Sequence, residues 1–336
     1  MENLKINKNL EELDNKLEKL FYSKFPSESG NKTLYHYTKL DTLEKILSSG
    51  TFRLYDAFTM NDPNEIYYAK KVFYNLIEKD NTLIKNSKIL EEVKKLENNF
   101  IKFCGLYENL PSAVLNQPME KKSYYNYFIL SACENPDYLP LWRYYGDNAK
   151  GVSIGFKNGI KKIEEIDYKQ QYFQITRVLY EKEYLESYFK EWFAEIDNYS
   201  KLNNKENYAT IMSTIMTYIT GTFHFNKHPD FESENEFRLV YTFDTNNHKE
   251  FEKNIKLDYD YKPNCNKFNF PELLKQNEVK QRYFYEHKFE KDFIEKIYVG
   301  PLLRFDETEQ KIKNWLYEYG YDFSKIEIVK SRKAFR

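Results

Sequence analysis

Hydrophobic residues recur every three or four positions through the first 22 residues, with charged and amide side chains between them. The leucines of this segment are Leu4, Leu10, Leu13, Leu17 and Leu20. This spacing places them on one side of a helix and predicts an amphipathic α-helix. Pro26 and Gly30 end the pattern, so we expect residues 1–30 to form an N-terminal helix followed by a linker.

The pattern then changes from strand to helix. Residues 33–38 are rich in Tyr and Thr and predict a β-strand. Residues 41–49 carry apolar side chains at helical spacing, and Gly50 is a typical helix stop. Phe52 to Leu54 begins the next predicted strand. Asp62 followed by Pro63 predicts the N-cap and first position of another helix.

Longer segments continue the alternation of helices and strands. Helical patterns occur near residues 67–108 and 180–219, and further strands are expected at residues 124–133, 152–156, 236–243, 294–300 and 326–329. Strands early and late in a chain, separated by helical blocks, indicate an α+β fold. We expect one α+β domain over residues 31–305, with helical insertions at those two blocks, and a C-terminal helix and strand with a basic tail over residues 306–336.

The composition supplies a large amount of aromatic core material. Of 336 residues, 41% are hydrophobic and 18% aromatic, so rings must fill much of the interior and line any pocket. The 51 Lys and Arg residues nearly cancel the 52 Asp and Glu residues. No global field therefore draws the chain to nucleic acid or to an anionic membrane. The basic stretch at residues 330–336 is expected to be a frayed tail.

The sequence gives no sign of export or of membrane insertion. It lacks both a secretory signal and an apolar stretch of roughly 18 residues, which predicts a cytoplasmic protein with no membrane partner. Its three cysteines, Cys104, Cys133 and Cys265, are widely spaced. This spacing argues against a disulfide framework and against a zinc site built from cysteines.

His36 is the first candidate functional residue. It lies in the predicted strand between Tyr35 and Tyr37, with Thr38 next, just before the predicted helix. A histidine among hydrogen-bonding neighbours, where a strand ends and a helix begins, fits the rim of a pocket. The structural alternative is a packed histidine with one satisfied hydrogen bond.

Two glutamates late in the chain are the second candidate. Glu234 and Glu236 alternate along a predicted strand and would project from one face, with Arg238 next on that face to orient Glu236. One carboxylate can then contact a sugar hydroxyl while the other contacts an incoming nucleophile. The alternative is a solvated strand face with a surface ion pair. If the sheet brings His36 opposite the glutamates, the three side chains form a polar cleft with aromatic walls.

Two further clusters have both structural and functional interpretations. His224, His228 and Glu232 are four residues apart and would align as zinc ligands on a helix, but Pro229 breaks that helix. Trp142 and Tyr145 lie three apart on a predicted short helix. They either pack in the core or offer a ring wall to a flat cationic ligand. The sequence contains no Walker loop, no G-x-G-x-x-G fingerprint and no nucleophile elbow, so the kinase, P-loop and Rossmann classes fit it poorly.

Several short segments form a distinctive set when they are taken together. They are Tyr35-His36-Tyr37-Thr38, Ile46 to Gly50, Phe58 to Pro63, Ser131, Trp142, Tyr145, Gly151 to Phe156, Glu234-x-Glu236-x-Arg238 and Ile297 to Pro301. Through this set the chain resembles a bacterial family known only as a domain of unknown function. The resemblance covers roughly residues 33–301. Phe231 departs from the pattern, because the family commonly has Trp three residues before the first glutamate.

The opening strand and helix, together with the late Glu-x-Glu, also resemble the ADP-ribosyltransferases. This resemblance implies a split β-sandwich with helical insertions. It implies that a strand-borne histidine positions NAD, an aromatic ring stacks on nicotinamide, and a late strand supplies the catalytic glutamate. The catalytic residues would be Glu236, Glu234 and His36, and the NAD-binding residues His36, Tyr37, Thr38, Trp142, Tyr145 and Arg238, with no metal site.

The implied function is the cleavage of NAD, consumed as a substrate, with transfer of ADP-ribose to a protein or nucleic acid acceptor or to water. An enzyme of this type fits a role in anti-phage defence or as a toxin. Two alternatives remain open at this point. One is a binding protein that senses a nucleotide or a phage component, and the other is a metal-dependent hydrolase or nuclease around His224 and His228.

Overall fold

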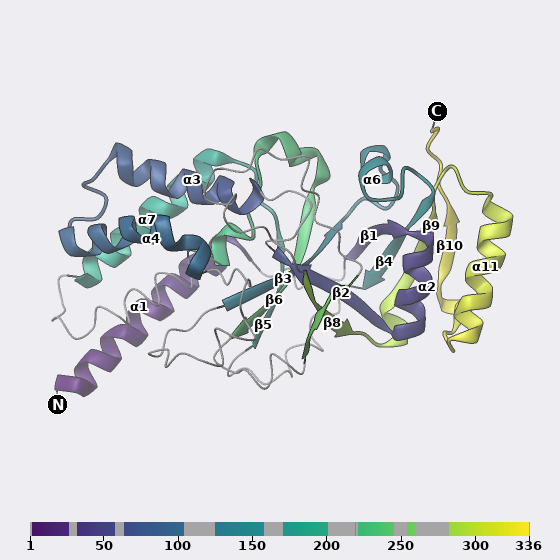
Figure 1. The fold of residues 1–336 in the computed structure, drawn as a ribbon, viewed down its shortest axis with the longest axis horizontal. Helices are drawn as coiled ribbons and strands as arrows, with labels where there is room; N and C mark the ends of the chain where they lie inside the picture. Colours follow the sequence, from purple (N-terminus) through teal and green to yellow (C-terminus); the bar gives the residue numbers. More distant parts are fainter. Residues whose placement is uncertain are drawn as a thin grey trace.

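The computed structural model describes residues 2–26, 32–57, 64–103, 125–157, 171–200, 219, 221–244, 254–259 and 282–335. Its described strands form one ten-stranded sheet, with a lobe of helices at one end and two helices against the other end (Figure 1). One strand pair is parallel, and the remaining pairs are antiparallel. The predicted α+β class is confirmed.

The helical lobe is built from four described helices. These are α1 (Glu2–Lys24), α3 (Asn64–Lys79), α4 (Ser87–Phe103) and α7 (Lys182–Ser200). The amphipathic pattern of the first segment is confirmed, because Leu13 and Leu17 are buried in the core of this lobe with Phe73 and Trp192. The predicted cap at Asp62 and Pro63 and the second part of the helical block, residues 201–218, lie outside the described residues.

The sheet branches at its central strand. The main path runs β10 (Glu327–Lys330), β9 (Ile294–Val299), β4 (Gly151–Lys157), β1 (Thr33–Lys39), β3 (Tyr125–Cys133), β2 (Thr51–Asp56), β8 (Tyr283–Lys288) and β7 (Ile255–Leu257). Off this path, β6 (Glu236–Asp244) pairs with β3 along its length, and β5 (Gln171–Arg177) pairs with β6. The branch places the start of β6 beside the end of β3, close to β1.

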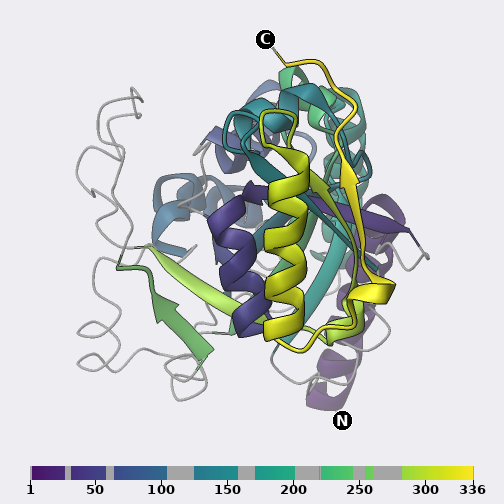
Figure 2. The ribbon, with the colours of Figure 1, turned by 90° about the vertical axis from the view of Figure 1, so that its right-hand side faces the viewer.

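Both faces of β3 are covered. Alternate residues point to opposite faces of a strand, so Phe128 and Leu130 join one core while Tyr127 and Ile129 join the core of the helical lobe. The first of these cores is covered by α2 (Leu40–Ser49) and α11 (Phe305–Glu318), which lie side by side in Figure 2. The expected helix stop is present, because Gly50 has the left-handed φ of 63°.

Three strands have no counterpart among the predicted elements. β7 is only three residues long, and β5 and β8 have polar residues among their apolar ones, so their apolar pattern is weak. The C-terminal tail also differs from the prediction of a frayed end. The Ser331 amide donates to the Val299 carbonyl at 3.1 Å, and the Ser331 side chain is buried. None of the described helices is both long and apolar enough to cross a membrane.

Candidate functional site

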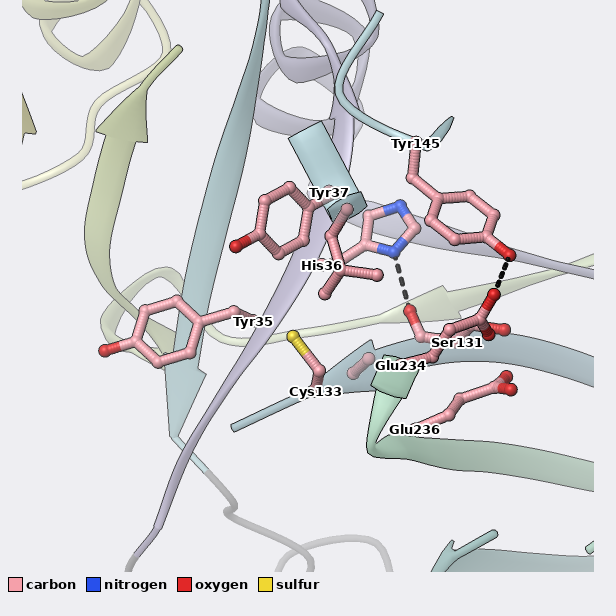
Figure 3. A pocket seen from close by; sticks show the side chains of 10 residues that line it. Tyr35, His36, Tyr37, Ser131, Cys133, Tyr145, Glu234 and Glu236 are labelled. Atoms are coloured by element: carbon pink, nitrogen blue, oxygen red, sulfur yellow. Dashed lines mark hydrogen bonds between the residues drawn. The ribbon is translucent and has the colours of Figure 1, made fainter. Parts of the chain in front are cut away.

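A pocket lies where β1, β3, the short helix α6 (Leu139–Tyr144) and the 3-10 helix η4 (Pro229–Glu234) meet. Its volume is about 60 Å³. The lining residues are Tyr35, His36, Tyr37, Ser131, Ala132, Cys133, Leu141, Tyr145, Glu234 and Glu236 (Figure 3). The fold therefore brings His36 and both glutamates to the same cavity, although about two hundred residues separate them in the sequence.

His36 reaches the pocket where β1 separates from β3. The two strands pair at Tyr35 and Cys133. Beyond this point, the His36 side chain contacts a backbone carbonyl of β3. Its Nδ1 lies 2.9 Å from the Ser131 carbonyl oxygen. A carbonyl can only accept, so Nδ1 carries the proton and Nε2 is the acceptor of the neutral ring. Burial lowers the pKa of His36, and the Ser131 hydrogen bond opposes this only in part, so the imidazole is neutral at pH 7.

The two glutamates reach the pocket through a turn and not through strand alternation. The structure places Glu234 at the end of η4, and β6 begins only at Glu236. Between them, Asn235 has the left-handed φ of 45°, a conformation that Asn tolerates better than most residues. The predicted strand over residues 234–236 is wrong for this reason. The turn nevertheless directs both carboxylates to one lysine, and the Lys227 Nζ donates to Glu234 Oε2 at 2.6 Å and to Glu236 Oε2 at 3.3 Å.

Glu236 is a buried and ionised carboxylate. The predicted partnership with Arg238 is present, since Nε of Arg238 donates to Oε1 at 2.9 Å and Nη2 donates to Oε2 at 3.2 Å. Burial acts to raise the pKa of Glu236, but the positive charges of Arg238 and Lys227 outweigh it and lower the pKa to about 2. The backbone amide of Glu236 is held as well, because it donates to the Tyr180 hydroxyl at 3.0 Å.

Glu234 is the more accessible of the two carboxylates. Its side chain is 13% exposed, against 5% for Glu236. Burial raises the pKa of Glu234, Lys227 partly offsets this, and the neighbouring charge of Glu236 raises the pKa again. The Tyr145 hydroxyl donates to Glu234 Oε1 at 3.0 Å, and burial raises the pKa of Tyr145, which keeps it a donor. Two carboxylates whose pKa values move in opposite directions are typical of a site that divides acid, base and electrostatic roles.

Lys227 is a residue of the candidate site that the sequence did not indicate. Its side chain is 3% exposed, and its Nζ donates hydrogen bonds to both glutamates. The same Nζ lies 4.8 Å from the centre of the Phe231 ring. Lys227 and Arg238 together balance the charges of the two glutamates, so the site has polar groups but no net charge. The lysine lies in an irregular segment before η4, where no helical or strand spacing relates it to the glutamates.

Three of the predicted NAD-binding residues do not line the pocket. Trp142 is fully buried, and its Nε1 donates to Asp137 Oδ1 at 2.7 Å, so its faces cannot stack on a ligand in this structure. Thr38 is buried in the pairing of β1 with β4, and Arg238 lies beneath Glu236. The ring wall is formed instead by Tyr35, Tyr37 and Tyr145. Figure 3 shows the His36 imidazole between the rings of Tyr37 and Tyr145 in that view.

The alternative metal ligands do not converge. The buried His224 ring packs on Tyr127 with ring centres 3.9 Å apart, whereas the exposed His228 accepts from the Asp230 amide at the start of η4. Glu232 is exposed on η4, which begins at Pro229, so the three residues do not align on one helix. Within the part of the chain that the structure describes, no group of three or more His, Cys, Asp or Glu side chains is placed to hold a metal ion.

The size of the pocket limits what it can hold as it stands. A cavity of about 60 Å³ has room for a few water molecules, whereas a cavity that takes up benzene measures about 150 Å³. A nicotinamide ring is at least as large as benzene. The pocket therefore does not enclose a ring of this size as it stands.

Comparison with known proteins gives one partial match. The model of a family described as a protein of unknown function, DUF2971, matches residues 141–239. This segment contains Tyr145, Lys227, Glu234 and Glu236 and begins well after His36. Searches of curated proteins and of solved structures found no match to the chain.

Proposed function

We propose that this protein is an ADP-ribosyltransferase-like enzyme that cleaves the bond between nicotinamide and ribose in NAD and passes ADP-ribose to a macromolecule or to water. The observation that supports the proposal is the meeting of His36 with Glu234 and Glu236 in one tyrosine-walled pocket. The proposal includes the fold implied by the resemblance, a β-sheet that splits around the NAD site. The separation of β1 from β3 beside His36 is consistent with such a split.

The chemistry needs a negative charge near the ribose more than it needs a strong base. As the glycosidic bond breaks, nicotinamide leaves as a neutral molecule with the bonding electron pair, and positive charge develops on the ribose ring. A carboxylate at the pocket surface stabilises that charge. Glu234 fits this role better than Glu236, because its side chain is the more exposed of the two and because Arg238 already holds both oxygens of Glu236.

Glu234 also fits the proton transfer that completes the reaction. The acceptor hydroxyl or water forms a bond to the ribose carbon and loses a proton, and a carboxylate with a raised pKa can take that proton. The Nε2 of neutral His36 can accept a hydrogen bond from a ribose hydroxyl or from the carboxamide of nicotinamide. The Tyr145 ring offers a face to the positively charged pyridinium before cleavage.

Nicotinamide release tests the proposal. Purified protein is incubated with NAD in the presence of proteins, oligonucleotides or buffer alone, and free nicotinamide is measured by chromatography. We expect release from the wild type and a fall of roughly 10²- to 10⁴-fold for Glu234→Gln, the range typical of a lost acid or base group. Glu232→Gln is the matched control, because Glu232 lies on the same short helix and is exposed. Equal nicotinamide release by wild type and Glu234→Gln would refute the role assigned to Glu234. If no nicotinamide is released under any condition, the proposal that the protein cleaves NAD is refuted.

A nucleotide sensor without turnover is the second candidate. The narrow pocket and the full pairing of Glu236 favour it, since both are also expected of a site that binds without reacting. Calorimetry separates the two functions. Binding of NAD by wild type with no nicotinamide formed supports the sensor, and turnover excludes it.

A further inference from the structure

The wall of the pocket opposite the glutamates is a short helix that cannot be stable by itself. α6 has only six residues, whereas isolated helices need about 12 to 15 residues to persist in water. It contributes Leu141 to the pocket, and Tyr145 follows directly at its C-terminal end. The hydrogen bond from Tyr145 to Glu234 spans the pocket from α6 to η4 (Figure 3). Movement of α6 would break this bond and widen the cavity.

The turn that follows α6 is strained. Asp147, Asn148 and Ala149 have φ values of 52°, 51° and 70°, three consecutive left-handed residues without a glycine among them. Asp and Asn tolerate this conformation better than most residues, but at Ala149 it costs roughly 1–2 kcal/mol and persists only where the surroundings hold it. Here the Ala149 amide donates to the Trp142 carbonyl at 2.9 Å, and the Leu302 amide donates to the Ala149 carbonyl at 3.1 Å. The strain gives α6 a tendency to move when its other contacts are lost.

The C-terminal tail supplies those other contacts through one carboxylate. Asp137, just before α6, accepts from the Ser331 hydroxyl at 2.6 Å and from the Arg332 amide at 2.8 Å. The same carboxylate accepts from the Trp142 indole at 2.7 Å, so it joins the tail directly to α6. The Arg143 guanidinium lies over the Phe335 ring at 5.5 Å. On a helix Arg143 projects away from Leu141 and Tyr145, so α6 is held between the pocket on one side and the tail on the other.

We propose that α6 with Tyr145 is a lid over the pocket and that residues 331–335 are a latch, which holds the lid closed through Asp137. In this structure the latch is engaged and the pocket is too small for a nicotinamide ring. Release of the latch lets α6 withdraw Tyr145 from Glu234 and opens the cavity. Asp137 is then a positioning residue that controls access without touching the ligand. The lid and latch do not depend on NAD being the ligand.

Chemical labelling of the Cys133 thiol can measure opening of the lid, and the measurement needs no ligand. Its thiol lines the pocket, donates to the Asn135 carbonyl at 3.2 Å, and has a pKa that burial raises to about 12. A thiol of this kind reacts slowly with alkylating reagents until it becomes accessible to solvent. Iodoacetamide labelling, followed by mass spectrometry of the peptide that contains Cys133, measures how often the lid opens. Cys104 and Cys265 lie in other peptides and do not contribute.

Two kinds of variant release the latch. One is a chain that ends at Lys330, and the other is Asp137→Asn or Ser331→Ala in the full chain. We expect labelling of Cys133 to rise about tenfold or more in the shortened chain and in Asp137→Asn, because local opening becomes frequent. The control is Asp322→Asn, since Asp322 also accepts from a serine hydroxyl and a backbone amide, at 2.6 and 3.2 Å, within the separate 3-10 helix η6 (Phe323–Lys325).

The outcomes separate the latch from the proposed function. A folded shortened chain with unchanged Cys133 labelling overturns the latch and leaves the NAD proposal untouched. Raised labelling without nicotinamide release supports the latch while the NAD proposal fails. If the shortened chain does not fold, Cys133 labelling of Asp137→Asn and Ser331→Ala tests the latch instead. The thermal unfolding of both variants is measured in parallel. Labelling that rises equally in Asp322→Asn reports general destabilisation and also overturns the proposal.

Discussion

Replacing Glu236 by Gln tests the electrostatic account of the site. The substitution keeps the shape of the side chain but removes the charge that Arg238 and Lys227 surround. The pKa of Glu236 falls from 4.5 to about 2 in the folded protein. Because the folded value lies below the unfolded value, the ionised carboxylate stabilises the fold fully above pH 4.5, and this contribution is lost as the pH falls through 2.

The magnitude follows from the two pKa values. At about 1.4 kcal/mol for each pH unit between them, Glu236 contributes about 3 kcal/mol to the free energy of unfolding at pH 7. At pH 3, about 1 kcal/mol of this remains. The difference in stability between wild type and Glu236→Gln should therefore shrink by about 2 kcal/mol between pH 7 and pH 3.

Urea unfolding followed by tryptophan fluorescence at both pH values measures this difference. Glu232→Gln is again the control, because Glu232 is exposed on the same short helix as Glu234. A gap between wild type and Glu236→Gln that stays constant from pH 7 to pH 3 would refute the reasoning. It would mean that the buried carboxylate is not held in its ionised form by Arg238 and Lys227.

Three further predictions concern the residues around the pocket. Lys227→Met removes the cation shared by the two glutamates, so we expect a loss of about 3–5 kcal/mol in urea unfolding and a higher pKa for Glu234 in a carboxyl NMR titration, whereas an unchanged titration would contradict the assignment. His36→Phe leaves the Ser131 carbonyl without its hydrogen bond and should cost about 1–3 kcal/mol in urea unfolding, and an unchanged stability would contradict the assigned hydrogen bond. Gly151→Ala would place a Cβ 2.1 Å from the Thr38 carbonyl oxygen, so the strand pairing beside the pocket must shift, and we expect the melting temperature to fall by several degrees.

Local chemistry made much of the fold predictable. The helix over residues 41–49 has a clear apolar face and a glycine stop, and it forms as α2 with Gly50 left-handed. Most of the predicted strands also form within a few residues of their expected bounds. β5 and β7 could not be found this way, because β5 alternates only weakly and β7 is too short to show a period. Their pairing is decided by β6 and β8 beside them.

The candidate site was partly predictable for a similar reason. His36, Glu234 and Glu236 stood out by their residue types and neighbours, and the fold brings them together in one pocket. The same reasoning placed Trp142 at the ligand and overlooked Lys227. Neither outcome was visible in the sequence, because burial of a ring and pairing of a lysine depend on which segments pack together.

The sequence by itself determined the helices, most strands, the residues able to do chemistry and the balance of charge, because these follow from spacing and composition within short segments. Only the tertiary structure decided which groups meet. The branch of the sheet at β3 sets His36 beside the start of β6, the turn at Asn235 directs both carboxylates to Lys227, and the tail reaches Asp137 from the far end of the chain. Contacts between segments so distant in sequence depend on long-range packing, which no local pattern encodes.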